Sequence, residues 1–201
     1  MHDRIYHEEV NLYVGPNRVL FQVYLKHLWV KIDFFDDLFT GDDPDGTHTF
    51  EDNGGELAAM LYDFDEDAFE LLLDWVRTDE PLLLNPGCIA LSRFYALADQ
   101  LRLKSLMDEI LEATIKNDLE QKELSIPYVD DMTTYCYLPK GSPFRKYICM
   151  GIAHMFQDQQ MSIAHLRRRL LCDEFCLDFL AVIQKGEPVS DPRDLPIECF
   201  K

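Results

Sequence analysis

FQVYLKHLWVKIDFFDDLF, residues 21–39, concentrates large apolar side chains in one short run. These side chains are Phe21, Leu28, Trp29, Phe34, Phe35, Leu38 and Phe39. Because water does not solvate such a run favourably, the neighbouring segments are expected to fold around it. The run therefore predicts the core of the N-terminal third of the chain.

A β-hairpin is predicted around the start of this run. Apolar and polar residues alternate over 10–14 and again over 19–23, and Gly15-Pro16-Asn17 between them is typical of a turn. After Val23 the spacing becomes helical. We expect one short helix whose apolar side is either Tyr24, Leu28 and Ile32 or Leu25, Leu28 and Trp29. A second is expected over Phe34–Phe39, with Asp33 as its N-cap.

Residues 40–56, TGDDPDGTHTFEDNGGE, differ sharply from the run before them. They combine glycines and acidic residues, and only Phe50 is suited to burial, so a mobile surface loop is expected. From Asp36 to Glu80 the acidic residues face a single cation, Arg77. Such a cluster is either a patch for a basic partner or a solvated loop with helix N-termini, and the second interpretation is favoured.

Helices dominate the remaining prediction. A strand is expected over Leu57–Tyr62, and Asp63 or Asp65 then caps a helix. That helix has a buried stripe at Phe69, Leu72, Leu73 and Val76, and an edge strand is expected at Leu82–Leu84. Two helices divided near Leu101 come next, followed by a junction over Lys116–Glu123 and a helical region over Ile126–Tyr137.

The end of the chain is also predicted to be mainly helical. Ser142 and Pro143 begin one helix, and Ser162 caps another, in which Ile163, Leu166, Leu170 and Leu171 are buried. A last helix contains Phe175, Phe179, Leu180 and Ile183, and an irregular tail is expected over Gly186–Lys201.

Composition excludes several function classes. The chain has 201 residues and a net charge of −18, which disfavours nucleic acids and anionic membranes as partners. No apolar run approaches the length of a membrane span. The six cysteines stand among helical patterns and no signal peptide precedes them, so we expect reduced thiols in the cytoplasm or nucleus.

No constellation for catalysis or metal binding emerges. Cys172 and Cys176, with His165 nearby, lack the second ligand pair that zinc requires. Arg167-Arg168-Arg169 is expected to be a solvated or intramolecularly paired helix face, with a contact for an acidic partner as the alternative. No glycine-rich phosphate loop is present. We therefore expect no cofactor, no metal and no enzymatic activity.

The first ~120 residues resemble a BTB/POZ domain, with length counted from the elements. The residues that carry the resemblance are Glu9–Val14, Phe21–Tyr24, Leu28, Phe34-Phe35, Asp65–Phe69, Leu72-Leu73, Trp75–Thr78, Tyr95–Leu101, Leu103, Leu106 and Met107. The chain is most similar to the short BTB proteins of filamentous fungi. The segment after Asn117 is similar to a helical extension of the BACK or 3-box kind.

The resemblance implies an α+β fold, in which a small β-sheet packs on helical hairpins and an all-α extension comes after it. The corresponding domains are residues 8–119, 120–185 and an irregular tail over 186–201. It further implies a protein-interaction module that binds other BTB chains, or an adaptor for a cullin-type ubiquitin ligase. The implied interaction surface consists of Phe35, Leu38, Phe39, Arg77, Thr78, Asp79 and Glu80.

Two departures from the family bear on self-association. Few residues precede the first strand near Glu9, and Leu25 stands where the family often has a basic residue. The short N-terminus argues against the familiar swapped N-terminal element, and Leu25 argues against the acid–base pair that some dimeric BTB repressors have inside their dimer pocket. Both therefore argue against dimerisation by the familiar route. Two alternatives to the interaction module stay open: a stand-alone regulator that caps other BTB assemblies, and an enzyme with an unrecognised site.

Overall fold

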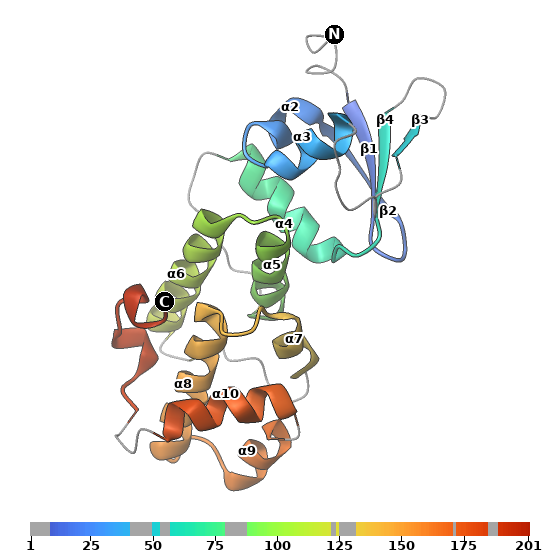
Figure 1. Cartoon of the computed structure of the whole chain (residues 1–201). Coiled ribbons are helices and arrows are strands. Elements are labelled where there is room, and N and C mark those ends of the chain that lie inside the picture. Colours follow the sequence, from blue (N-terminus) through green and yellow to red (C-terminus); the bar gives the residue numbers. More distant parts are fainter. Residues whose placement is uncertain are drawn as a thin grey trace. The chain divides into compact units, whose positions relative to one another are not determined.

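The computed structural model describes residues 9–40, 50–52, 57–78, 88–121, 124, 132–170, 172–184 and 189–201 (Figure 1). The chain forms two compact units. The N-terminal unit comprises residues 1–81 and 100–103, and the C-terminal unit comprises 82–99 and 104–201. Together they make a mixed α+β protein, as predicted.

The N-terminal unit is built on a four-stranded sheet of order β2-β1-β4-β3. The predicted hairpin is confirmed: β1 (Glu9–Val14) pairs antiparallel with β2 (Val19–Tyr24), and Leu12 stands opposite Phe21. Strand β4 (Leu57–Leu61) pairs with β1 in parallel. The alternation in β1 places Val10, Leu12 and Val14 in the core, each fully buried.

The hairpin turn needs a glycine at its first position. Gly15 has a φ of +72°, which residues with a side chain rarely adopt. A Cβ there would lie 2.6 Å from the Glu66 side chain, and the Gly15 amide donates to the Leu61 carbonyl at 2.9 Å. Gly15 thus joins the hairpin to the end of β4.

The prediction of an irregular loop over residues 40–56 is wrong in part. Phe50–Asp52 forms strand β3, which pairs antiparallel with β4. The glycine and acid content of the segment did not predict strand β3, because its hydrogen bonds depend on β4, a partner strand that lies later in the chain. Residues 41–49 and 53–56 are outside the described part.

The described part of this unit also contains three helices, and the apolar run packs there as predicted. They are α2 (Leu25–Trp29), α3 (Asp33–Thr40) and α4 (Glu66–Arg77). Phe35 and Phe69 are fully buried, and the Phe69 ring lies 5.2 Å from Phe21 and 6.3 Å from Phe64, between centroids. Asp65 caps α4 by accepting from the Ala68 amide, as expected, whereas Asp33 is the first residue of α3 and not its cap.

The C-terminal unit is helical. Its helices are α5 (Cys88–Gln100), α6 (Lys104–Gln121), α7 (Met132–Tyr137), α8 (Pro143–Gln157), α9 (Ile163–Arg169) and α10 (Asp173–Ile183). The predicted break near Leu101 is confirmed, and Arg102 takes a φ of +58° within it. Ser142 and Ser162 cap α8 and α9 as expected.

Helix α6 continues through the predicted junction at residues 116–121. Lys116 pairs with Glu120 one turn later at 4.0 Å, and the buried Asp118 accepts a hydrogen bond from the Tyr147 hydroxyl at 2.6 Å. The predicted domain boundary at residue 119 therefore falls inside a helix, whereas compactness divides the chain near residues 81 and 104.

The prediction of an irregular tail is wrong for the end of the chain. Residues 192–194 and 197–199 form the short 3₁₀ helices η1 (Pro192–Asp194) and η2 (Ile197–Cys199), which contact α6 (Figure 1). Phe200 is 1% exposed and packs edge-on against Tyr147. Burial of this one ring orders a segment whose prolines had indicated a loop.

Among the described residues, no helix has both the length and the apolar character needed to cross a membrane.

Candidate functional site

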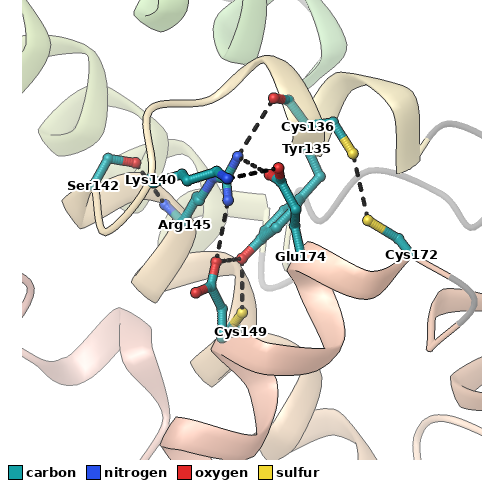
Figure 2. A network of polar contacts seen from close by, with 9 residues as sticks. Tyr135, Cys136, Lys140, Ser142, Arg145, Cys149, Cys172 and Glu174 are labelled. Atoms are coloured by element: carbon teal, nitrogen blue, oxygen red, sulfur yellow. Dashed lines mark hydrogen bonds and ion pairs between the residues drawn. The ribbon is translucent and has the colours of Figure 1, made fainter.

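The buried Arg145 is the centre of a network of charges in the C-terminal unit (Figure 2). Its side chain is 3% exposed, and its Nη2 donates to Glu174 Oε2 at 2.7 Å. Its Nη1 lies 3.4 Å from Asp178 Oδ2, and Glu174 also pairs with Lys140 at 3.2 Å. Since α8 supplies the arginine and α10 both acids, the network ties these two helices together.

Tyr135 and Cys149 extend the network inward. The Tyr135 hydroxyl donates to Asp178 Oδ2 at 2.6 Å and lies 3.2 Å from the Cys149 Sγ. Burial raises the pKa of Tyr135 far above its usual range, and burial raises the pKa of Cys149 to about 12. Both groups therefore stay protonated near neutral pH, so neither is an activated nucleophile or base.

A groove of about 430 Å³ adjoins these residues on the C-terminal unit. Arg145, Cys149 and Asp178 line it on one side, and Val182, Val189 and Leu195 supply apolar walls. Arg145 Nε is buried and has no hydrogen-bond partner among the described residues. No sequence pattern indicated this groove, because its walls come from α8, α10 and the tail.

Glu174 gives this network a pH dependence. Hydrogen bonds from Arg145 and then Lys140 hold the pKa of Glu174 below its usual 4.5. An acid with a lowered pKa stabilises the folded state above its ordinary pKa, and this contribution is lost as the pH falls through the folded value.

We therefore predict that Glu174→Gln lowers the stability of the C-terminal unit by the same amount at pH 7 and pH 5. Below pH 4.5 the difference between variant and wild type shrinks, because the wild-type carboxylate becomes protonated. Thermal unfolding by circular dichroism across this pH series measures the effect. A difference that stayed constant down to pH 3 would contradict the role assigned to Glu174.

The predicted interaction surface does not lie together at the surface of the N-terminal unit. Phe35 and Leu38 are 0% and 4% exposed and belong to the core, and Phe39 is half-buried. Arg77 and Thr78 are exposed at the end of α4. Asp79 and Glu80 are outside the described residues.

The end of α4 is held by a neighbouring lysine. Lys31 Nζ donates to the carbonyls of Trp75 and Thr78, both at 3.0 Å, and lies over the Trp75 ring. A cation at the C-terminus of a helix is favourable, because the last carbonyls there have no partner within the helix. This contact fixes the position of Arg77 and Thr78 against the segment after α2.

Strand β2 is an exposed edge of the sheet that the predicted surface did not include. Its sequence, VLFQVY, has no charge and no proline. Leu20 and Tyr24, on the face away from the core, are 48% and 45% exposed. In the part of the chain that the structure describes, β2 has a strand partner on one side only, β1.

The arginine cluster Arg167–Arg169 and the candidate metal ligands His165, Cys172 and Cys176 all lie in the C-terminal unit. Arg167 and Arg168 are exposed on α9 as expected, but Arg169 is 3% exposed, so the three do not form one solvated face. The described residues contain no group of three or more side chains placed to hold a metal ion. His165 instead lies 3.1 Å from the Ser162 hydroxyl.

The described elements thus define an α+β protein whose N-terminal sheet has an open edge and whose helical unit contains a charge network around the buried Arg145. Comparison with protein-family models and with curated proteins finds no match for this chain.

Proposed function

We propose that this chain is a non-enzymatic protein-interaction module with a BTB/POZ-type N-terminal domain, and that it associates with a second copy of itself through the edge of β2. The observation that carries this proposal is strand β2, which among the described residues pairs with β1 alone. Natural sheet edges are normally blocked by charges, prolines or bulges, because an open edge pairs with other chains. The sequence VLFQVY contains no charged residue and no proline.

Strand β2 is better suited than the other surfaces of the chain to make the contact between two copies. Two copies of β2 related by a two-fold axis form an antiparallel ladder, which satisfies the outward main-chain groups of both. The strand carries no charge, whereas the whole chain has a net charge of −18. Contacts through most other surfaces would therefore bring like charges together.

The BTB assignment has separate support. The hairpin, helices α2 and α3, strands β3 and β4 and helix α4 follow one another along the chain, and β4 pairs with β1 in parallel. A small sheet combined with helices in this way is consistent with what the resemblance implies. A cullin adaptor remains the narrower hypothesis within this class. It predicts that cullin is enriched when the tagged chain is purified from cells, and absence of enrichment at low salt would remove it.

We predict that Leu20→Lys weakens self-association at least about tenfold. The substitution removes an apolar contact between the two paired strands, and it places two lysine charges, one from each copy, close together. Sedimentation equilibrium of the wild type and the variant measures this. The matched control is Val30→Lys, since Val30 is 80% exposed in the same unit but outside the sheet.

A wild type that stays monomeric over the whole accessible concentration range would overturn the self-association. Equal weakening by Leu20→Lys and Val30→Lys would place the contact elsewhere. The wild type could instead be monomeric and capture a different BTB chain, with Leu20→Lys abolishing this capture. That result would show that the β2 edge binds the other chain and not a second copy of this one.

A further inference from the structure

We propose that Cys136 and Cys172 are a modification site, a dithiol pair that a small-molecule disulfide such as oxidised glutathione converts to an intramolecular disulfide. The Sγ atoms lie 3.4 Å apart, although the residues are 36 positions apart in sequence (Figure 2). Both are free cysteines; Cys136 is exposed and Cys172 is partly exposed.

The pair joins two elements that the chain otherwise connects by a long path. Cys136 is in α7, and Cys172 is the N-cap of α10. Arg145 holds the backbone near both cysteines. Its Nη2 lies 3.4 Å from the Cys136 carbonyl and also donates to Glu174, which is two residues after Cys172. The two sulfurs therefore face each other in a frame that other contacts already hold.

Oxidation would proceed by two thiol–disulfide exchanges. The Cys136 thiolate attacks one sulfur of oxidised glutathione, which forms a mixed disulfide and releases one glutathione thiol. The Cys172 sulfur then attacks the Cys136 sulfur and releases the second glutathione. The two protein thiols lose two electrons and two protons, and one oxidised glutathione becomes two reduced molecules.

The rate of the first step depends on pH. Loss of solvent around the sulfur, together with the weaker effect of the hydrogen bond with Cys172, raises the pKa of Cys136 to about 11. Only a small fraction is thiolate at pH 7, so attack on the oxidant accelerates as the pH rises. The second step is intramolecular, with the attacking sulfur already in contact, and is expected to outpace capture by a further glutathione.

Two of the other described cysteines, Cys149 and Cys199, provide internal controls. Cys149 is buried against Tyr135, and Cys199 is exposed in η2. Among the described residues, the structure places neither of them against a second sulfur. Cys199 is therefore expected to stop at the mixed disulfide with glutathione, whereas the Cys136–Cys172 pair goes on to an internal bond.

The test treats the full-length reduced chain with oxidised glutathione at pH 8.5, alkylates the remaining thiols and maps the products by mass spectrometry without reduction. The expected product is a peptide pair joined through Cys136 and Cys172. In Cys172→Ser, Cys136 should retain glutathione, with at least about tenfold more adduct than in the wild type. Cys199→Ser should form the internal bond as the wild type does.

A second measurement does not depend on the variants. The disulfide closes a loop of 36 positions, which restricts the unfolded chain. The oxidised wild type is expected to unfold at a temperature higher by roughly 5 °C or more, and reduction should reverse the shift. Stable glutathione adducts on Cys136 in the wild type, pairing of Cys136 with Cys176, or oxidation only between molecules would each overturn the proposal.

Discussion

Phe69→Ala is expected to destabilise the N-terminal unit by about 3–5 kcal/mol, the usual cost of removing a fully buried phenylalanine ring. Phe69 is 0% exposed, and its ring contacts those of Phe21, Phe35 and Phe64. These four come from β2, α3, the segment before α4, and α4, so the cavity would open where the elements meet. The loss combines transfer of the ring to water with unfilled space around its neighbours.

Tryptophan fluorescence during urea unfolding measures this effect within one unit, because the two tryptophans of the chain, Trp29 and Trp75, both belong to the N-terminal unit. Val30→Ala is the control. Val30 is 80% exposed, so its truncation is expected to change stability by less than about 0.5 kcal/mol. A Phe69→Ala effect as small as that of the control would contradict the aromatic core described here.

Arg145→Met is expected to destabilise the C-terminal unit by about 2–4 kcal/mol. Removing one partner from a buried ion pair leaves the opposite charges without compensation. Arg145 is 3% exposed, whereas Glu174 and Asp178 each keep 35% of their side-chain surface exposed. Water can therefore reach the two acids in part, which places the cost toward the lower end of the range for fully buried pairs.

Lys140→Met is the matched control for this network. Lys140 pairs with the same Glu174 at 3.2 Å, but its side chain is 80% exposed, and exposed pairs contribute only about 0–1 kcal/mol. Amide hydrogen exchange in the peptides of α8 and α10 reports the stability of this unit directly. Comparable effects of the two substitutions would show that burial of Arg145 does not set the strength of the network.

Much of the N-terminal unit could be predicted because its signals are local. The alternation in residues 10–14, the turn at Gly15 and the stripe of α4 each identify an element without reference to the rest of the chain. Strand β3 was missed since Phe50–Asp52 becomes a strand only through pairing with β4. Phe35 and Leu38 were placed on a contact surface by the resemblance, but the same apolar character that predicted the core buries them.

The C-terminal unit shows where periodicity stops being informative. Helical spacing predicts a face but does not decide which of two apolar faces is covered. Ile163 was expected to be buried and is 75% exposed. Leu180 and Ile183, which belong to the apolar residues that predicted the last helix, are 39% and 38% exposed. The charge network and the Cys136–Cys172 pair were missed for a different reason, because each joins residues from separate helices whose packing no local pattern encodes.

Hydrogen–deuterium exchange of β2 across a protein concentration series tests the central claim most directly. If two copies pair through this edge, the amides of Val19–Tyr24 should become more protected as concentration rises, while α10 does not change. Leu20→Lys should remove the added protection. Exchange in β2 that is independent of concentration, in a sample shown to self-associate, would contradict an account in which the open sheet edge is the site of contact.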